Sequence, residues 1–128
     1  MNLTESRALA ARLASLLRQE HHAMADFLVA LAEFDQRRGW LELGHSGLFP
    51  FLNRELGLSK AAAFFRMTAA GLIQRFPEVT EPLRDGRLCL TTMASLAKVL
   101  TPENRAVVLP RFFSRSGLEA KAIAAELC

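Results

Sequence analysis

The chain has 128 residues, a length typical of one domain, and 51% of them are apolar, which is enough for one substantial core. The longest apolar run falls short of the roughly 18 residues of a membrane span, and the first residues lack a signal-peptide layout. We therefore expect a cytoplasmic domain with no membrane partner. The two cysteines make neither a disulfide framework nor a zinc site. Net charge is +3, and residues 36–76 carry six basic against two acidic residues, a modest electrostatic signal for a polyanion.

The first predicted element is a long helix over about residues 4–38. Apolar residues recur at steps of three and four from Leu9 to Phe34, which is the pattern of one helical stripe. Thr4 is a candidate cap, and Gly39 follows two arginines at the expected end. About 30 helical residues at 1.5 Å each span roughly 45 Å. Because that exceeds what a compact domain of this length needs, we expect the helix to project or to find a partner helix.

The next predicted unit is a helix-turn-helix over about residues 47–76. Residues 40–45 are expected to form a loop, and Ser46 is expected to cap a short helix that ends at Gly57. Ser59 then caps a second helix that runs to Phe76, just before a proline. A short helix, a glycine turn and a capped second helix are the parts of this motif.

Several short helices are predicted over about residues 78–127. One ends at Gly86, the next is expected to begin after Thr91, and a third is expected to follow Thr101. Ser116 and Glu119 form a predicted capping box for the last one. With no alternating apolar and polar stretch of strand length, the prediction is a single all-α domain of residues 1–128. It consists of a long N-terminal helix followed by about five or six shorter helices.

The helix that starts after Ser59 is the candidate DNA-binding element. In a helix-turn-helix, the second helix lies in the major groove and its first turn meets base edges. Lys60 and Arg66 could reach phosphate or guanine, while Ala63 is expected to face inward. Two helices joined by a glycine turn also occur in helical bundles that bind no DNA. The candidate DNA-binding residues are Ser59, Lys60, Ala61, Ala62, Arg66 and Arg54.

The sequence also favours a second interpretation, a protein-interaction or dimerisation module. Phe64 and Phe65 are adjacent and cannot both face the core, and an exposed phenylalanine favours a protein partner over DNA. The long first helix offers an apolar stripe that one small core does not cover. A homodimer through this helix, with Leu17 and Leu28 as contact residues, is therefore the alternative to double-stranded DNA as the partner.

No complete catalytic site is predicted. His21 and His22 are adjacent on a helix, so they point about 100° apart and cannot chelate one ion together. His45 has no recognisable partners for nucleophilic catalysis. We expect no catalytic residue, no metal, no cofactor and no small-molecule substrate in this chain.

Five short motifs occur in a defined order along the chain. They are Leu43-Gly-His-Ser-Gly-Leu-Phe49, Leu56-Gly-Leu-Ser-Lys-Ala-Ala-Ala63, Arg75-Phe-Pro77, Leu83-Arg-Asp-Gly-Arg-Leu-Cys-Leu-Thr-Thr92 and Leu100-Thr-Pro-Glu-Asn104. Together they resemble the helical N-terminal region of bacterial proteins that carry an HNH endonuclease domain further on. This resemblance covers the chain from about residue 8 and implies a role beside a nuclease that could lie downstream in a longer natural protein. An HNH site needs paired histidines, an asparagine and usually metal-binding carboxylates, and none of His21, His22 and His45 lies in such a setting.

The middle of the chain also resembles the helix-turn-helix part of ParB-type partition proteins. The matching pieces, in order, are Gly57-Leu58-Ser59, Pro77-Glu78-Val79 and Leu83-Arg-Asp-Gly-Arg-Leu88. This likeness implies duplex DNA as the partner. The helix after Ser59 departs from the basic pattern of such relatives, because it has Phe65, Gly71 and Gln74 in its later part. Weaker phosphate attraction is expected to follow.

Overall fold

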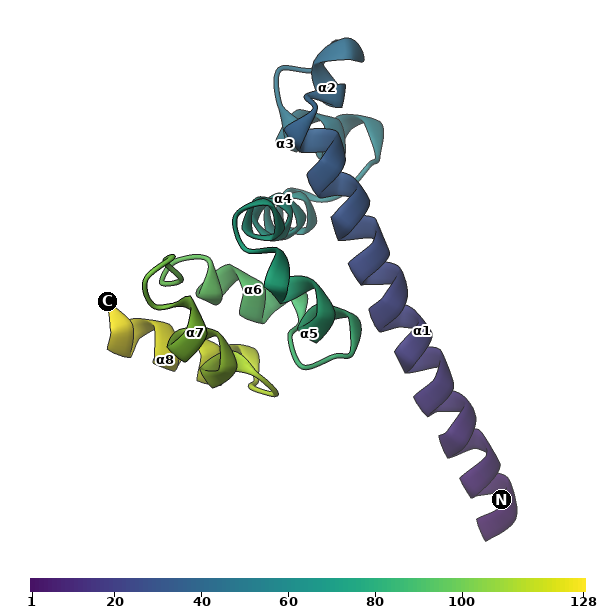
Figure 1. Ribbon diagram of the computed structural model, residues 1–128. Coiled ribbons are helices and arrows are strands. Elements are labelled where there is room, and N and C mark those ends of the chain that lie inside the picture. The colour runs from purple at the N-terminus through teal and green to yellow at the C-terminus, as the bar shows by residue number, and fades with distance from the viewer.

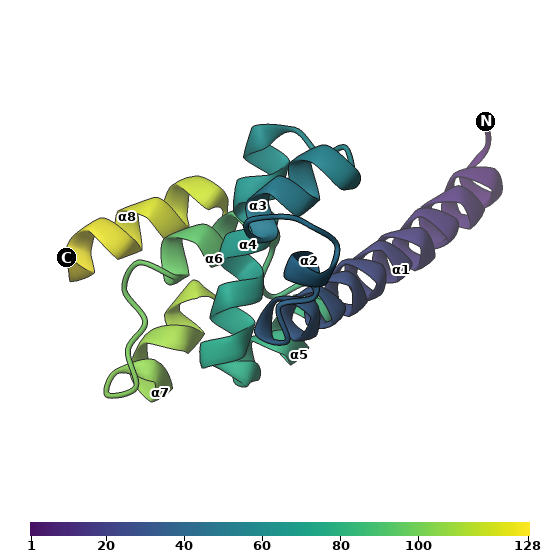
Figure 2. The same cartoon turned by 90° about the horizontal axis from the view of Figure 1, so that it is seen from above.

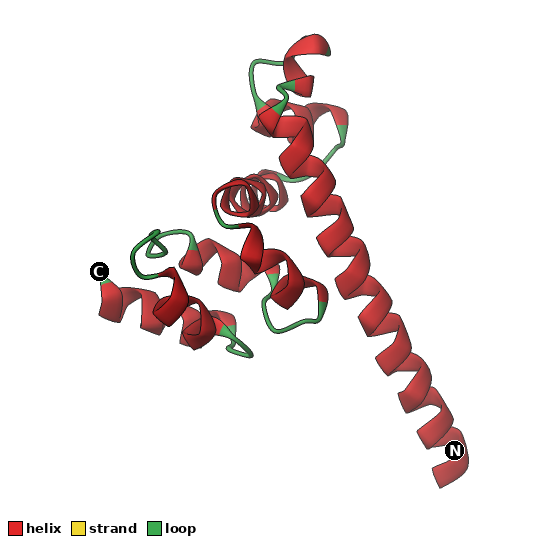
Figure 3. Cartoon of the chain, viewed as in Figure 1, coloured by secondary structure: helices red, strands yellow, loops and turns green.

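The Ala- and Leu-rich segments form eight α-helices and no strand in a computed structural model that describes residues 1–128 (Figures 1 and 3). The all-α class with a long first helix is therefore confirmed. The seven shorter α-helices exceed the predicted number because single turns also form. The α-helices are α1 (Leu3–Gln36), α2 (Gly39–Glu42), α3 (Leu48–Pro50), α4 (Lys60–Arg75), α5 (Thr80–Arg84), α6 (Leu90–Leu96), α7 (Arg105–Val108) and α8 (Gly117–Leu127).

Three further helical turns adjoin these elements. A π-helical turn, Phe51–Glu55, continues α3, and 3-10 turns cover Pro77–Val79 and Leu109–Phe112. No helix has both the length and the apolar character that a membrane crossing requires.

Helix α1 has 34 residues and a length of roughly 51 Å. Its cap is Asn2, whose side-chain oxygen accepts a hydrogen bond from the Glu5 amide at 2.8 Å, so the prediction of Thr4 was wrong by two positions. The purple N-terminal half projects away from all other helices in both views (Figures 1 and 2). Only the second half of α1 docks, against α4 and α5.

The core lies where the second half of α1 meets α4, α5 and α6. Leu28 on α1, Leu72 on α4 and Leu96 on α6 are fully buried in it. α6 in turn packs against α8, whose Ala120 and Ala124 are buried. Because these small side chains sit at the contact, α8 can approach α6 closely. The result is a globular body at one end of a long helix.

The region between α1 and α4 differs from the prediction in two places. Residues 40–45 were expected to be a loop, but α2 forms there because the Trp40 indole donates to the Asp35 carboxylate at 2.9 Å and holds the turn against α1. Ser46 does not cap α3, whose preceding residue is Gly47 with no side-chain cap. The Ser59 cap of α4 is confirmed, because its Oγ accepts a hydrogen bond from the Ala62 amide at 3.1 Å.

Helix starts in the C-terminal half were predicted with mixed success. α6 begins after Cys89 rather than Thr91, because the Thr92 hydroxyl accepts a hydrogen bond from the Cys89 amide at 2.9 Å. α7 begins only at Arg105, after a turn in which Asn104 and Thr101 exchange hydrogen bonds. The Ser116 capping box of α8 is confirmed, with Glu119 as its reciprocal partner.

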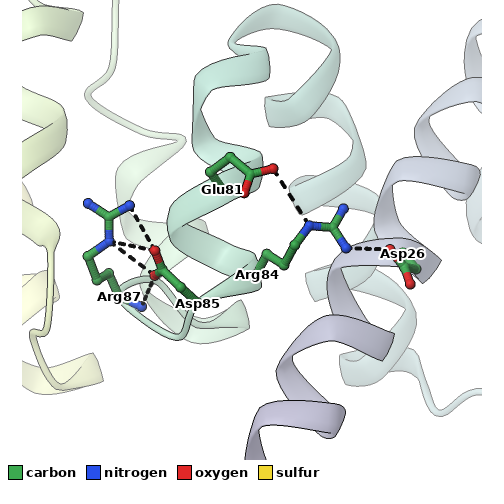
Figure 4. Close-up of polar contacts among 5 residues, drawn as sticks. All are labelled: Asp26, Glu81, Arg84, Asp85 and Arg87. Atoms are coloured by element: carbon green, nitrogen blue, oxygen red, sulfur yellow. Dashed lines mark hydrogen bonds and ion pairs between the residues drawn. The ribbon is translucent and has the colours of Figure 1, made fainter.

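A tight turn after α5 holds the body onto α1 (Figure 4). The Arg84 guanidinium reaches across to the Asp26 carboxylate on α1. On the other side of the turn, hydrogen bonds from the Arg87 side chain lower the pKa of Asp85. Gly86 lies at the turn with a φ of +88°, and the His21 ring of α1 packs directly over it. The turn therefore places a charged contact and a steric contact against the same stretch of α1.

A second charged contact predicts acid sensitivity. Hydrogen bonds from the Arg105 guanidinium lower the pKa of Glu78 from its ordinary value of 4.5, and this cation also lies 5.0 Å from the Phe76 ring centroid. A lowered carboxyl pKa adds stability that is full above pH 4.5 and lost as the pH falls below it. The melting temperature of wild type should therefore exceed that of Glu78→Gln above pH 4.5, and the difference should shrink at lower pH. Glu103→Gln, at an exposed site outside all eight ion pairs, is the control for the loss of one carboxylate.

Candidate nucleic-acid interface

One side of α4 is open to solvent. Lys60 and Arg75, near its two ends, are exposed, and Phe64 between them is 51% exposed. At about 100° per residue these three side chains lie within one sector of the helix, opposite the buried Ala69 and Ile73. No aspartate or glutamate occurs anywhere from residue 56 to residue 77. The exposed side of α4 is therefore free of negative charge from its own segment.

Arg66 does not share this side. Six residues separate it from Lys60, so the two side chains point roughly 120° apart. Arg66 is half-buried on the side facing α1, where its guanidinium donates to the Ala62 carbonyl at 3.1 Å and lines a cavity together with Glu20. The sequence grouped Lys60 and Arg66 on one DNA-facing surface, whereas the structure separates them.

The other candidate residues surround the start of α4. The Ser59 hydroxyl is occupied by its capping bond, and the adjacent Ala62 is half-buried. Ala61 is exposed and offers only a methyl group. Arg54, in the π-helical turn, is exposed and takes part in no ion pair. Ser59, Lys60, Ala61 and Arg54 therefore remain accessible.

A groove of about 580 Å³ runs beside the exposed side of α4. Phe64 and Thr68 of α4 form one wall, Leu118 and Lys121 of α8 form the other, and α6 forms the floor, with Lys98 just beyond its end. No acidic residue lines this groove. Lys98 and Lys121 line this groove, and Lys60 lies one turn of α4 before the groove residue Phe64. We call these three lysines, together with the groove, the lysine face.

The cations of the lysine face lack carboxylate partners, in contrast to the arginines of residues 78–128. Eight ion pairs occur in the structure, and none of them includes Lys60, Lys98 or Lys121. Elsewhere on the body most arginines are neutralised, as Arg84, Arg105 and Arg111 illustrate. Sequence reasoning missed Lys98 and Lys121 because each is a lone lysine in its own segment. Only the packing of α6 and α8 beside α4 brings them to the same surface.

The free half of α1 presents a second candidate surface. Leu9, Leu13, Leu16 and Leu17 are 47%, 65%, 43% and 51% exposed. These four leucines form the leucine stripe. Leu28, which the sequence placed in the same interface, is fully buried in the core and cannot be a contact residue. Leu56 is exposed at a cavity between α1 and the turn before α4.

The remaining polar groups are engaged locally. His45 lies 3.0 Å from the Glu55 carboxylate, and His21 packs over Gly86. No group of three or more His, Cys, Asp or Glu side chains could hold a metal ion. No family model, curated protein or solved structure matches the chain. The function is therefore inferred from the two surfaces described above.

Proposed function

We propose that this chain is a non-catalytic helical domain that binds double-stranded DNA through the lysine face. The observation that carries the proposal is a set of three lysines without carboxylate partners around an acid-free helix. When unpaired cations of a protein contact DNA phosphates, the counterions condensed on the DNA are released, and this release is the main source of non-specific affinity for DNA. The resemblance to HNH-associated and ParB-type helical segments supports the same partner.

The chemistry of the face favours phosphate contacts over base reading. Lysine binds phosphate as a point charge, whereas Ala61 could contact at most a thymine methyl group. Arg66, the arginine predicted to reach guanine, is turned toward α1, and Arg75, at the far end of α4 from Lys60, lies over the Phe76 ring. We therefore propose binding that depends strongly on salt and weakly on sequence.

The decisive experiment compares two charge-matched double variants. Lys60→Glu with Lys121→Glu removes two cations from the lysine face, and Arg7→Glu with Arg12→Glu removes two exposed cations from α1. Fluorescence anisotropy with a labelled duplex should show the first variant weakened on the order of tenfold per lysine near 0.1 M salt. Its slope of log affinity against log salt should fall in magnitude by about two, while the α1 variant changes much less.

Two outcomes would contradict the proposal. Equal losses of affinity in both variants would mean that DNA binding depends only on the net charge of the protein. Wild-type affinity in the Lys60 and Lys121 variant would show that DNA does not use the lysine face. Arg66 is left unchanged in this design because its loss would also remove a hydrogen bond within α4.

A second candidate function, self-association through α1, is favoured by the leucine stripe. Four half-exposed leucines on one projecting helix form an apolar surface of the kind that marks protein interaction sites. The two functions are compatible, because many helix-turn-helix proteins bind DNA as dimers. Light scattering over a range of protein concentrations measures this association directly.

A further inference from the structure

We infer that the free half of α1 pairs with the same segment of a second copy in antiparallel orientation, about a two-fold axis near Leu13. This inference rests on the second candidate function and names its partner and geometry. The free half comprises residues 3–19, which are exposed except for the half-buried Ser15. The first α1 residues to line a cavity with the rest of the chain are Glu20 and His21.

The leucine stripe is accessible to another helix. The mean direction of its four leucines is rotated by roughly a quarter turn about the α1 axis from the direction of the buried Ala25, Leu28 and Ala32. The body therefore lies beside the stripe and does not cover it. Figures 1 and 2 agree that no other element approaches the N-terminal half of α1.

The stripe is symmetric in the way that an interface between identical helices requires. Leu9 lies four residues before Leu13, and Leu17 lies four residues after it. An antiparallel two-fold axis at Leu13 therefore places Leu9 across from the partner's Leu17, and every stripe position meets an apolar one.

Glu20 discriminates between the two orientations. It continues the stripe seven residues after Leu13, and a parallel pair in register would set its carboxylate against the partner's Glu20. In the antiparallel pair, the residue across from it is the partner's Ser6, whose hydroxyl can donate a hydrogen bond to the carboxylate. The contact between like charges is thereby replaced by a polar contact without repulsion.

The antiparallel arrangement also fits the shape of the molecule. It places the two bodies at opposite ends of the paired helices, whereas a parallel pair would bring them to the same end (Figure 1). The stripe runs into a cavity of about 490 Å³ lined by apolar residues that include Met24, Phe27 and Leu56. Leu3 lies ten residues before Leu13, and Ala23, which lines the cavity, lies ten residues after it. The start of each α1 would therefore reach the partner's cavity.

Disulfide trapping tests the orientation in the full chain. Cys89 and Cys128 are first replaced by serine, and Ser6→Cys and Glu20→Cys are then introduced into separate chains. An antiparallel pair should give a disulfide between the two different chains when they are mixed and oxidised. Disulfides between two Ser6→Cys chains, or between two Glu20→Cys chains, would instead show a parallel pair. In the antiparallel pair, position 6 lies roughly 20 Å from position 6 of the partner, and the same holds for position 20.

A charge change gives a second, independent result. Ser6→Lys places two cations across from two Glu20 carboxylates in the antiparallel dimer and should tighten dimerisation roughly threefold, as measured by sedimentation equilibrium. In a parallel dimer the same change sets lysine against lysine and should weaken it. A chain that stays monomeric at high concentration would overturn both this inference and the second candidate function. A dimer that gives the parallel results would overturn only the antiparallel geometry.

Discussion

Aspartate at position 28 is expected to unfold the domain, whereas aspartate at position 17 should leave the fold intact and abolish self-association. Leu28 is 0% exposed where α1 crosses the core, and Leu17 is half-exposed on the free half of the same helix. Truncating a buried leucine alone costs about 2–5 kcal/mol, and burying an unpaired carboxylate adds several more. That sum is comparable to the whole stability of a small domain, about 5–15 kcal/mol.

Circular dichroism and light scattering separate these two effects. Leu17→Asp should melt close to wild type and scatter as a single chain at concentrations where wild type associates. Leu28→Asp should lose its cooperative melting transition. A normally folded Leu28→Asp protein would mean that α1 does not dock through this leucine. An associating Leu17→Asp protein would remove the leucine stripe from the interface.

The second large effect is expected for Gly86→Ala. A φ of +88° is costly for any residue with a Cβ, by about 1–2 kcal/mol. In addition, a Cβ at this position would lie 2.6 Å from Cε1 of His21, so the ring or the turn must shift. Overpacking of this kind typically costs about 1–3 kcal/mol more. The expected loss of unfolding free energy is therefore about 2–5 kcal/mol.

Gly44 provides a matched control, because its φ is +87° and a Cβ there would meet nothing within 4 Å. Urea denaturation of Gly44→Ala should report the backbone cost alone, and Gly86→Ala should lose distinctly more. Adding His21→Ala to Gly86→Ala should recover the excess. If the two single variants lose the same free energy, the contact between the turn and α1 is looser than the structure indicates.

The amino-acid sequence determined the features that depend on neighbouring residues. The period of three and four in α1 and the caps at Ser59 and Ser116 were predicted correctly, because these signals span only one or two turns of helix. Errors occurred where two residues two positions apart could serve as the cap, as at the starts of α1 and α6. At the exposed start of α1 the stronger capping preference of asparagine over threonine decides, and at α6 the Thr92 hydroxyl bonds the Cys89 amide.

Only the tertiary structure decided which surfaces are open. Leu17 and Leu28 belong to one helical pattern, yet one is exposed and the other buried, because periodicity identifies a face of a helix but not how far along it the body reaches. Lys98 and Lys121 reach the groove beside α4 only because α6 packs against α4 and α8 packs against α6. Burial and the grouping of charges depend on contacts between residues far apart in the chain, which local sequence patterns do not encode.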